Sequence, residues 1–123
     1  MQQVTVQSHK VIMVDVDDTL ILWDTSKYPD LKEVEVSIND LTATVRINEK
    51  NVNLVKKLAK LDYTIVVWSQ TGYDWAEAVS NAVGLSQYVS LYLTKPRYYV
   101  DDKECQKWMG ERLWRDPTTG ESE

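Results

Sequence analysis

The sequence predicts an α/β fold built on a parallel sheet, and three observations support this prediction. Continuous apolar runs at residues 11–14 and 63–68 are typical of parallel strands that are buried on both faces. Apolar residues at helical spacing follow at 54–61 and at 75–83. The resulting order of strand, helix, strand, helix and strand favours right-handed parallel connections. We therefore expect a three-layer, Rossmann-like parallel sheet with a β-hairpin flap after the first strand.

The flap is predicted at residues 33–47. Apolar and polar residues alternate on both sides of Asn39 and Asp40, as they do in strands with one buried face. These two residues tolerate positive φ and suit a tight turn. Earlier in the chain, Pro29 and Asp30 mark another turn.

Local signals mark the ends of both predicted helices. Asn48 is a suitable N-cap for the first helix. The strand at 63–68 ends at Ser69, and Asp74 with Glu77 resembles an acidic capping box for the second helix. Gly84 is expected to end that helix.

The last third of the chain carries weaker signals. A third strand is predicted at 88–93, and a short fourth strand at 98–100 is separated from it by Pro96. A final helix is predicted at 103–109, and residues 116–123 are predicted to form a flexible tail.

Length and composition are those of one globular domain over residues 1–123. No apolar run is long enough for a transmembrane helix or a secretory signal, so a cytoplasmic protein without a membrane partner is expected. The net charge of -5 does not indicate a general nucleic-acid surface, although a phosphorylated nucleic-acid end stays compatible with it. With only Cys105 and His9 available, any metal would be bound by oxygen.

Polar side chains stand at or near the ends of the predicted strands, and these residues are Asp15, Asp17, Ser69, Lys95, Asp101 and Asp102. Each of them taken singly is more common as a turn residue, a helix cap or a solvated charge. The carboxyl ends of parallel strands meet at one edge of a sheet, where open α/β sheets bind ligands. Their joint placement therefore predicts a site at that edge.

The order of these residues resembles the haloacid dehalogenase superfamily. The Asp-x-Asp-x-Thr motif after a buried strand is matched by Asp15 to Thr19, and the strand that ends in Ser or Thr is matched at Ser69. Lys95 matches the lysine motif, and Asp101 with Asp102 matches the paired acids. The resemblance implies a phosphomonoester hydrolase that forms an aspartyl phosphate.

The resemblance also implies a role for each catalytic residue. Asp15 would be the nucleophile, and Asp17 would protonate the leaving oxygen and later activate water. Ser69 would hold a phosphoryl oxygen, and Lys95 would neutralise the charge on the nucleophile and the phosphoryl group.

Further residues complete the expected site. The phosphate-binding set is predicted to comprise Asp18, Thr19, Ser69, Gln70 and Lys95. A Mg²⁺ ion is the expected cofactor, because it prefers oxygen ligands and would offset the repulsion between a carboxylate and a phosphate dianion. The resemblance implies that its ligands are Asp15, the Asp17 carbonyl and Asp101, with Asp102 in the outer shell or orienting Lys95.

Two departures from the family pattern concern the site itself. Many relatives carry glycine where this chain has Asp18, which adds negative charge near the phosphate. Many also place a longer helical segment between the lysine and the paired acids than residues 96–100 provide. Lys95 is therefore expected to reach the site from a loop.

The chain leaves no room for the cap domain that many relatives insert, so a capless protein is expected, with 33–47 as a flap. Its substrate would be a small phosphorylated metabolite or a phosphorylated macromolecular end. Trp23 and Tyr28 are candidate substrate contacts, although packing explains aromatic residues equally well. A homo-oligomer interface is a further hypothesis, and it rests on Trp108, Leu113 and Trp114.

Two alternatives to a phosphatase stay open. The first is a catalytically weak protein of the same type that binds a metal or phosphate. The second is a receiver-like phospho-acceptor domain, which also gathers acids, a hydroxyl and a lysine at one sheet edge. Motif order disfavours the receiver. A receiver has its acid pair after the first strand and its phosphorylated aspartate after a later one, whereas here Ser69 follows the second functional strand and the second acid pair comes last.

Overall fold

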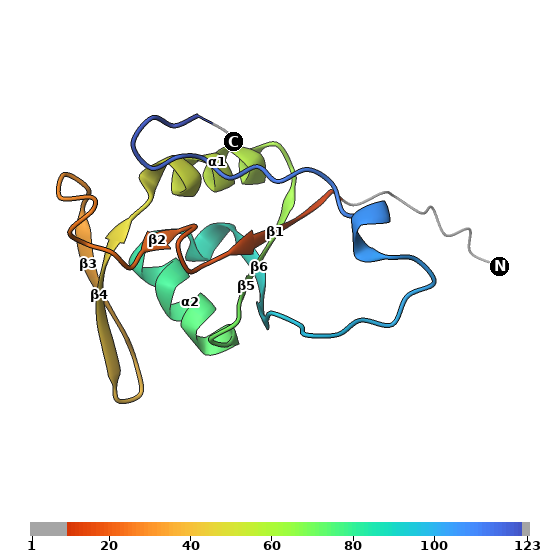
Figure 1. Cartoon of the computed structure of the whole chain (residues 1–123), viewed down its shortest axis with the longest axis horizontal. Helices are drawn as coiled ribbons and strands as arrows, with labels where there is room; N and C mark the ends of the chain where they lie inside the picture. The colour runs from red at the N-terminus through yellow and green to blue at the C-terminus, as the bar shows by residue number, and fades with distance from the viewer. Residues whose placement is uncertain (1–9, 122–123) are drawn as a thin grey trace.

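The computed structural model describes residues 10–121, which form two small sheets and two α-helices (Figure 1). Strands β1, β5 and β6 form one sheet in the order β1-β5-β6, and every pairing in it is parallel. Their bounds are β1 Val11–Asp15, β5 Thr64–Ser69 and β6 Val89–Thr94. This confirms the mixed α/β class and the parallel sheet, whose first strands carry the apolar runs seen in the sequence.

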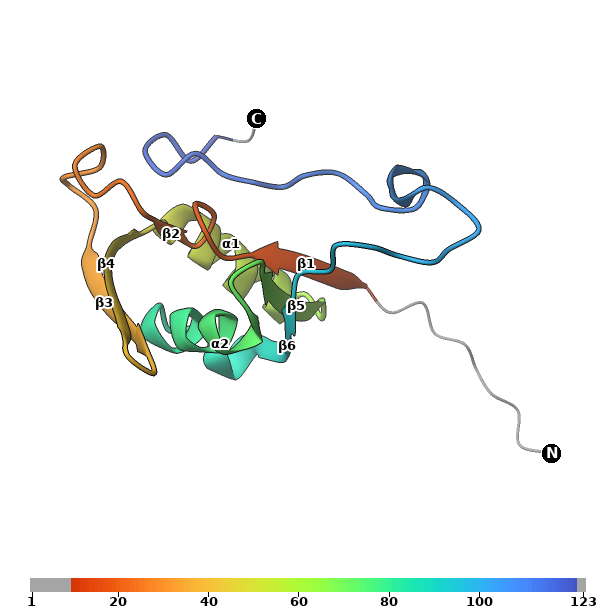
Figure 2. The same cartoon turned by 60° about the horizontal axis from the view of Figure 1, so that its bottom comes forward.

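The predicted hairpin is confirmed as the main part of a separate antiparallel sheet. Strands β3 (Glu33–Ile38) and β4 (Leu41–Ile47) pair along their whole length, and the short strand β2 (Ile21–Leu22) pairs with the other edge of β4. Asn39 has a φ of 48°, as a tight turn of this kind requires. The hairpin packs against the second helix, α2 (Tyr73–Ala82) (Figures 1 and 2).

Helix α1 (Glu49–Lys60) begins as predicted, because the Asn48 side chain accepts a hydrogen bond from the backbone N–H of Asn51. Helix α2 (Tyr73–Ala82) begins differently. Its N-cap is Gly72, so the predicted capping box at Asp74 is wrong. Gly72 has a φ of 136° and lies two residues before Asp74. Asp74 falls inside the first turn, where its carboxylate is a favourable charge and accepts a hydrogen bond from the backbone N–H of Trp75 at 2.9 Å.

One hydrophobic core joins both helices to the parallel sheet. Ile65 and Val67 of β5 are fully buried, and Val55 of α1 and Val79 of α2 belong to the same buried cluster. The alternate residues of the strands point to the opposite face of the sheet, which is more exposed to solvent than the face that the helices cover. Its most exposed apolar residues are Val11, Leu91 and Leu93, with exposed fractions of 52%, 49% and 37%.

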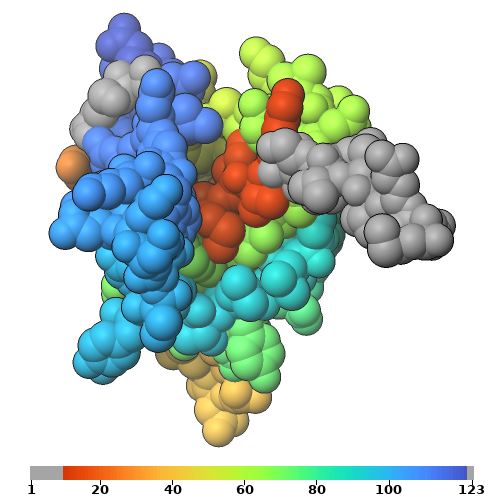
Figure 3. Space-filling model, turned by 90° about the vertical axis from the view of Figure 1, so that its right-hand side faces the viewer, coloured from red at the N-terminus to blue at the C-terminus, as the bar shows by residue number. Residues whose placement is uncertain are grey.

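The chain after β6 departs most from the sequence prediction. Residues 98–100 form no strand, and the helix predicted at 103–109 is reduced to the single 3-10 turn η2 (Cys105–Lys107). Residues 96–109 extend away from the helices (Figure 1) and form a ridge beside the first strand (Figure 3), whereas the end of the chain returns along α1. A parallel strand needs a crossover of a dozen or more residues, and the few residues after Thr94 are too short for one.

Another 3-10 turn, η1 (Ser86–Tyr88), leads into β6, which therefore starts one residue later than expected. The flexible tail was predicted over 116–123, and the structure describes it as far as residue 121. There the backbone N–H of Asp116 donates to Glu121 O at 2.8 Å, and that of Gly120 donates to Asp116 O at 2.9 Å. Residues 116–121 thus form a hydrogen-bonded turn.

Candidate functional site

The candidate site lies where the three parallel strands end. Asp15 is the last residue of β1, Ser69 is the last of β5, and Lys95 directly follows β6. Asp17 lies two residues beyond β1 and reaches Ser69 through its side chain. The structure therefore brings together four of the residues that the sequence predicts for the site.

Asp15 has two partners and keeps part of its carboxylate open to solvent. Thr19 Oγ1 donates to Asp15 Oδ2 at 3.1 Å, and Lys95 Nζ lies 3.8 Å from Asp15 Oδ1. The side chains of Asp15 and Lys95 are each about one third exposed, at 34% and 35%. The Lys95 ammonium also lies 5.8 Å from the ring centroid of Trp68, which holds it over the sheet edge. A ligand can therefore approach Asp15 from solvent beside a positive charge.

The Asp17 carboxylate is held far more tightly, because it accepts three hydrogen bonds. The indole N–H groups of Trp23 and Trp75 both donate to Oδ1 at 3.0 Å. Ser69 Oγ donates to Oδ2, also at 3.0 Å. Each oxygen thus has a fixed partner, so the orientation of this carboxylate is set before any ligand binds.

Trp75 belongs to the apolar helical stripe at 75–83, which predicts a core residue and not a contact with the site. The residue is fully buried, as a core residue should be, but its indole N–H faces Asp17. A buried tryptophan normally finds an acceptor for that group. The available signal was the position of Trp75, which lies six residues after the strand end at Ser69, on the far side of the loop.

Ser69 connects all parts of the site. Its hydroxyl donates to Asp17 and accepts from the backbone N–H of Thr71 at 3.0 Å. Its carbonyl accepts from the backbone N–H of Lys95 at 2.9 Å, which fixes where the lysine leaves β6. Gln70, predicted to bind phosphate, is exposed at the start of the same loop.

Asp18 occupies a position that requires unusual backbone geometry. Its φ is 59°, a left-handed conformation that glycine adopts freely and aspartate tolerates better than most residues. Its side chain is exposed and accepts a hydrogen bond from the backbone N–H of Trp23 at 3.2 Å. This hydrogen bond is the observed role of Asp18, which the sequence analysis placed among the phosphate-binding residues.

Two buried asparagines tie this loop to the C-terminal segment. Asn51 Nδ2 donates to Thr19 O at 2.9 Å, and Asn51 Oδ1 accepts from the backbone N–H of Arg115 at 2.7 Å. Asn48 Nδ2 donates to Arg115 O at 3.3 Å, and Trp114 Nε1 donates to Asp18 O at 3.3 Å. The C-terminal segment is therefore part of the structure that supports the Asp15 to Thr19 loop.

Asp101 and Asp102 do not reach the site, and their predicted position at a strand end is wrong. Both are exposed in the irregular segment after β6, and Asp101 Oδ1 accepts from the backbone N–H of Lys103 at 3.0 Å. Within residues 10–121, no three or more His, Cys, Asp or Glu side chains are grouped so that they could hold a metal ion. The predicted magnesium ligands are thus not assembled, and only Asp15 and Asp17 lie at the sheet edge.

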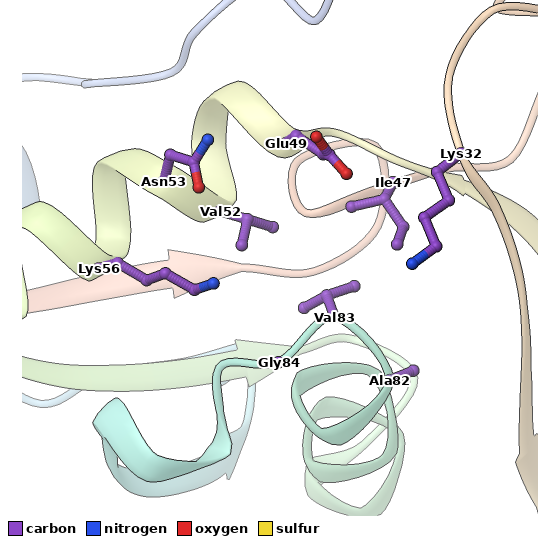
Figure 4. Close-up of a pocket in the computed structure, with 9 residues that line it drawn as sticks. All are labelled: Lys32, Ile47, Glu49, Val52, Asn53, Lys56, Ala82, Val83 and Gly84. Carbon is purple, nitrogen blue, oxygen red and sulfur yellow. The ribbon is translucent and has the colours of Figure 1, made fainter.

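Two open hollows elsewhere on the surface do not include the site. The one in Figure 4 has a volume of about 300 Å³ and lies between α1 and the end of α2, with the amino groups of Lys32 and Lys56 directed into it. The other has a volume of about 510 Å³ and is lined in part by Tyr28. Tyr28 thus lines a hollow that includes none of the strand-end residues, whereas Trp23 is hydrogen-bonded to Asp17.

Comparison with protein-family models, with curated proteins and with solved structures finds no match for this chain. In the part that the structure describes, neither α-helix has the length and apolar character needed to cross a membrane.

Proposed function

We propose that this protein is a phosphomonoester hydrolase that acts through an aspartyl phosphate on Asp15. The observation that supports this most directly is the environment of Asp15, which is solvent-accessible and lies 3.8 Å from Lys95. A second carboxylate, Asp17, is fixed at the same sheet edge by hydrogen bonds. An attacking carboxylate, a cation for the phosphoryl oxygens and a proton-transfer group are the components that this chemistry needs.

In the proposed first step, an Asp15 oxygen forms a bond to phosphorus and the ester P–O bond breaks. Asp17 gives a proton to the departing oxygen, and it later takes one from the water that hydrolyses the acyl phosphate. When Asp17 carries a proton, the hydrogen bond that the protonated oxygen accepts is weakened and can rearrange. Ser69 is suited to this, because a hydroxyl can accept as well as donate, whereas an indole N–H can only donate.

Charge at the site supports a need for an additional cation. Asp15 and Asp17 bring two negative charges, and Lys95 is the cation paired with Asp15. A phosphomonoester dianion would add further repulsion. We therefore keep magnesium as part of the proposal. The structure does not gather the expected ligands, so no step of the reaction is assigned to the metal.

The finer description of the protein is also proposed. The parallel sheet with its hairpin is compatible with a Rossmann-like, capless hydrolase in which residues 33–47 act as a flap. The substrate would be a phosphorylated metabolite or a phosphorylated macromolecular end, and the protein would act in the cytoplasm. Resemblance to the haloacid dehalogenase superfamily supports these points through the motifs from Asp15 to Lys95.

One observation favours a second candidate function, which is binding of phosphate or a metal without turnover. Asp101 and Asp102 lie outside the sheet edge, so the acids expected to complete the site are not in place. A protein that retains Asp15, Lys95 and Thr19 could bind a phosphorylated ligand and hydrolyse it poorly.

The experiment that separates these functions is a screen of sugar phosphates, nucleotides and phosphorylated nucleic-acid ends, with and without magnesium. We expect Asp15→Asn to abolish hydrolysis while circular dichroism shows an intact fold. Asp17→Asn should retain ligand binding and lose turnover. Asp30→Asn, an exposed acid away from the site, is the control. Full activity in Asp15→Asn would refute the mechanism, and hydrolysis of no substrate by the unmodified protein would favour the binding function.

A further inference from the structure

We infer that Trp23 forms a stacking subsite for an aromatic ring in the leaving group of the substrate. This inference rests on the proposed function and makes its substrate class more specific. It starts from the unusual combination of exposure and restraint at Trp23, which is 43% exposed although it lies in the site.

Three contacts hold Trp23 in place. Its indole N–H donates to Asp17 Oδ1 at 3.0 Å, and its backbone N–H donates to Asp18 Oδ1 at 3.2 Å. Its ring stacks on that of Trp75, with centroids 5.7 Å apart and planes inclined by 21°. An exposed tryptophan that is free to rotate loses side-chain entropy when a ligand binds to it. Here the contacts within the protein already fix the ring before a ligand binds.

Trp75 covers one face of the Trp23 ring, and Trp23 is still 43% exposed. The polar edge of the ring points to Asp17, so the solvent-exposed part of the side chain is apolar and aromatic. A flat aromatic surface that is fixed before binding favours a planar partner, because aromatic pairs gain energy in offset stacks and little further entropy is lost.

The position of this surface indicates which part of a substrate would reach it. A phosphoryl group would lie at Asp15 and Lys95, and the departing oxygen would lie at Asp17. The Trp23 indole is hydrogen-bonded to Asp17, so its ring lies beside the place proposed for the departing oxygen. The substrate class is therefore a phosphomonoester whose alcohol carries an aromatic ring near the ester oxygen.

Binding of two unreactive analogues tests this inference independently of turnover. Benzylphosphonate and cyclohexylmethylphosphonate have similar size and charge, and only the first is aromatic. We expect the unmodified protein to bind benzylphosphonate about threefold to tenfold more tightly by calorimetry, as one aromatic pair predicts. Trp23→Phe should keep most of this preference, and Trp23→Leu should lose it. Both variants lack the bond to Asp17, so their difference isolates the aromatic face.

Equal affinity for the two analogues, a preference that survives in Trp23→Leu, or no binding of either analogue would overturn the inference. Hydrolysis of benzyl phosphate is measured separately. A preference that follows Trp23 in a protein that hydrolyses no phosphomonoester would refute the proposed function and support the aromatic subsite.

Discussion

Asn51 offers the sharpest test of how the site is supported, because one buried side chain joins the loop from β1 to the C-terminal segment. Asn51→Ala removes the bonds to Thr19 O and to the backbone N–H of Arg115, which measure 2.9 Å and 2.7 Å. Each bond contributes about 0.5 to 1.5 kcal/mol, and leaving a buried partner unpaired adds to the loss. We expect a decrease of about 2 to 4 kcal/mol in the free energy of unfolding, which is a large part of the stability of a small domain.

Urea denaturation measures this decrease, and Asn53→Ala is the matched control. Asn53 lies on the same helix, is exposed and undergoes the same change in helix propensity. Asn51→Asp separates the two bonds, since it can still accept from Arg115 but cannot donate to Thr19. In Asn51→Asp, amide hydrogen exchange should increase in the Asp15 to Thr19 loop, and it should increase less in the C-terminal segment around Arg115. A stability for Asn51→Ala within about 0.5 kcal/mol of that of Asn53→Ala would refute the reasoning.

Three further predictions concern single side chains. Ser69→Ala removes a donor to Asp17 and should lower kcat on a phosphomonoester more than it raises KM; an unchanged kcat would contradict the role of this contact. Asp18→Gly should change the free energy of unfolding, measured in urea, by less than about 1 kcal/mol, because the relief of backbone strain at a φ of 59° offsets the lost hydrogen bond from Trp23. Asp18→Val should lower the free energy of unfolding clearly more, and equal free energies for the two variants would argue against strain at this position. Hydrogen bonds from the backbone N–H groups of Thr119 and Thr118 lower the pKa of Asp116 below its ordinary value of 3.8. The turn is thus stabilised above that value and should loosen as the pH falls below about 4, as amide exchange in 116–121 would show, whereas Asp116→Asn should remove this pH dependence.

The parts of the fold that depend on local pattern could be predicted from the sequence. The hairpin followed from alternation and from the Asn39 and Asp40 turn, and the structure pairs its strands in the expected way. The cap at Asn48 also followed from one residue and its immediate neighbours. In each case, the residues that determine the element lie within a few positions of it.

The fourth strand could not be predicted correctly from local pattern. Residues 98–100 have strand propensity, but a parallel strand also needs enough chain to return to the start of the sheet. Pro96 and the few residues around it do not provide that length. The crossover rule, applied to the sequence, would have argued against this strand and against placing Asp101 at the sheet edge.

The structure adds a difference in restraint between the two acids of the motif. Asp15 and Asp17 are two residues apart, yet they are restrained to different degrees. Asp15 accepts one hydroxyl at 3.1 Å and faces an ammonium at 3.8 Å, so it can move toward a ligand and exchange partners. Asp17 accepts three donors at 3.0 Å, two of them from tryptophans that also stack on each other. A nucleophile must advance along a reaction path, whereas a proton-transfer group must stay aligned with the departing oxygen. The contacts thus support the roles proposed for the two acids, since Asp15 is open to a ligand and Asp17 is held in one orientation.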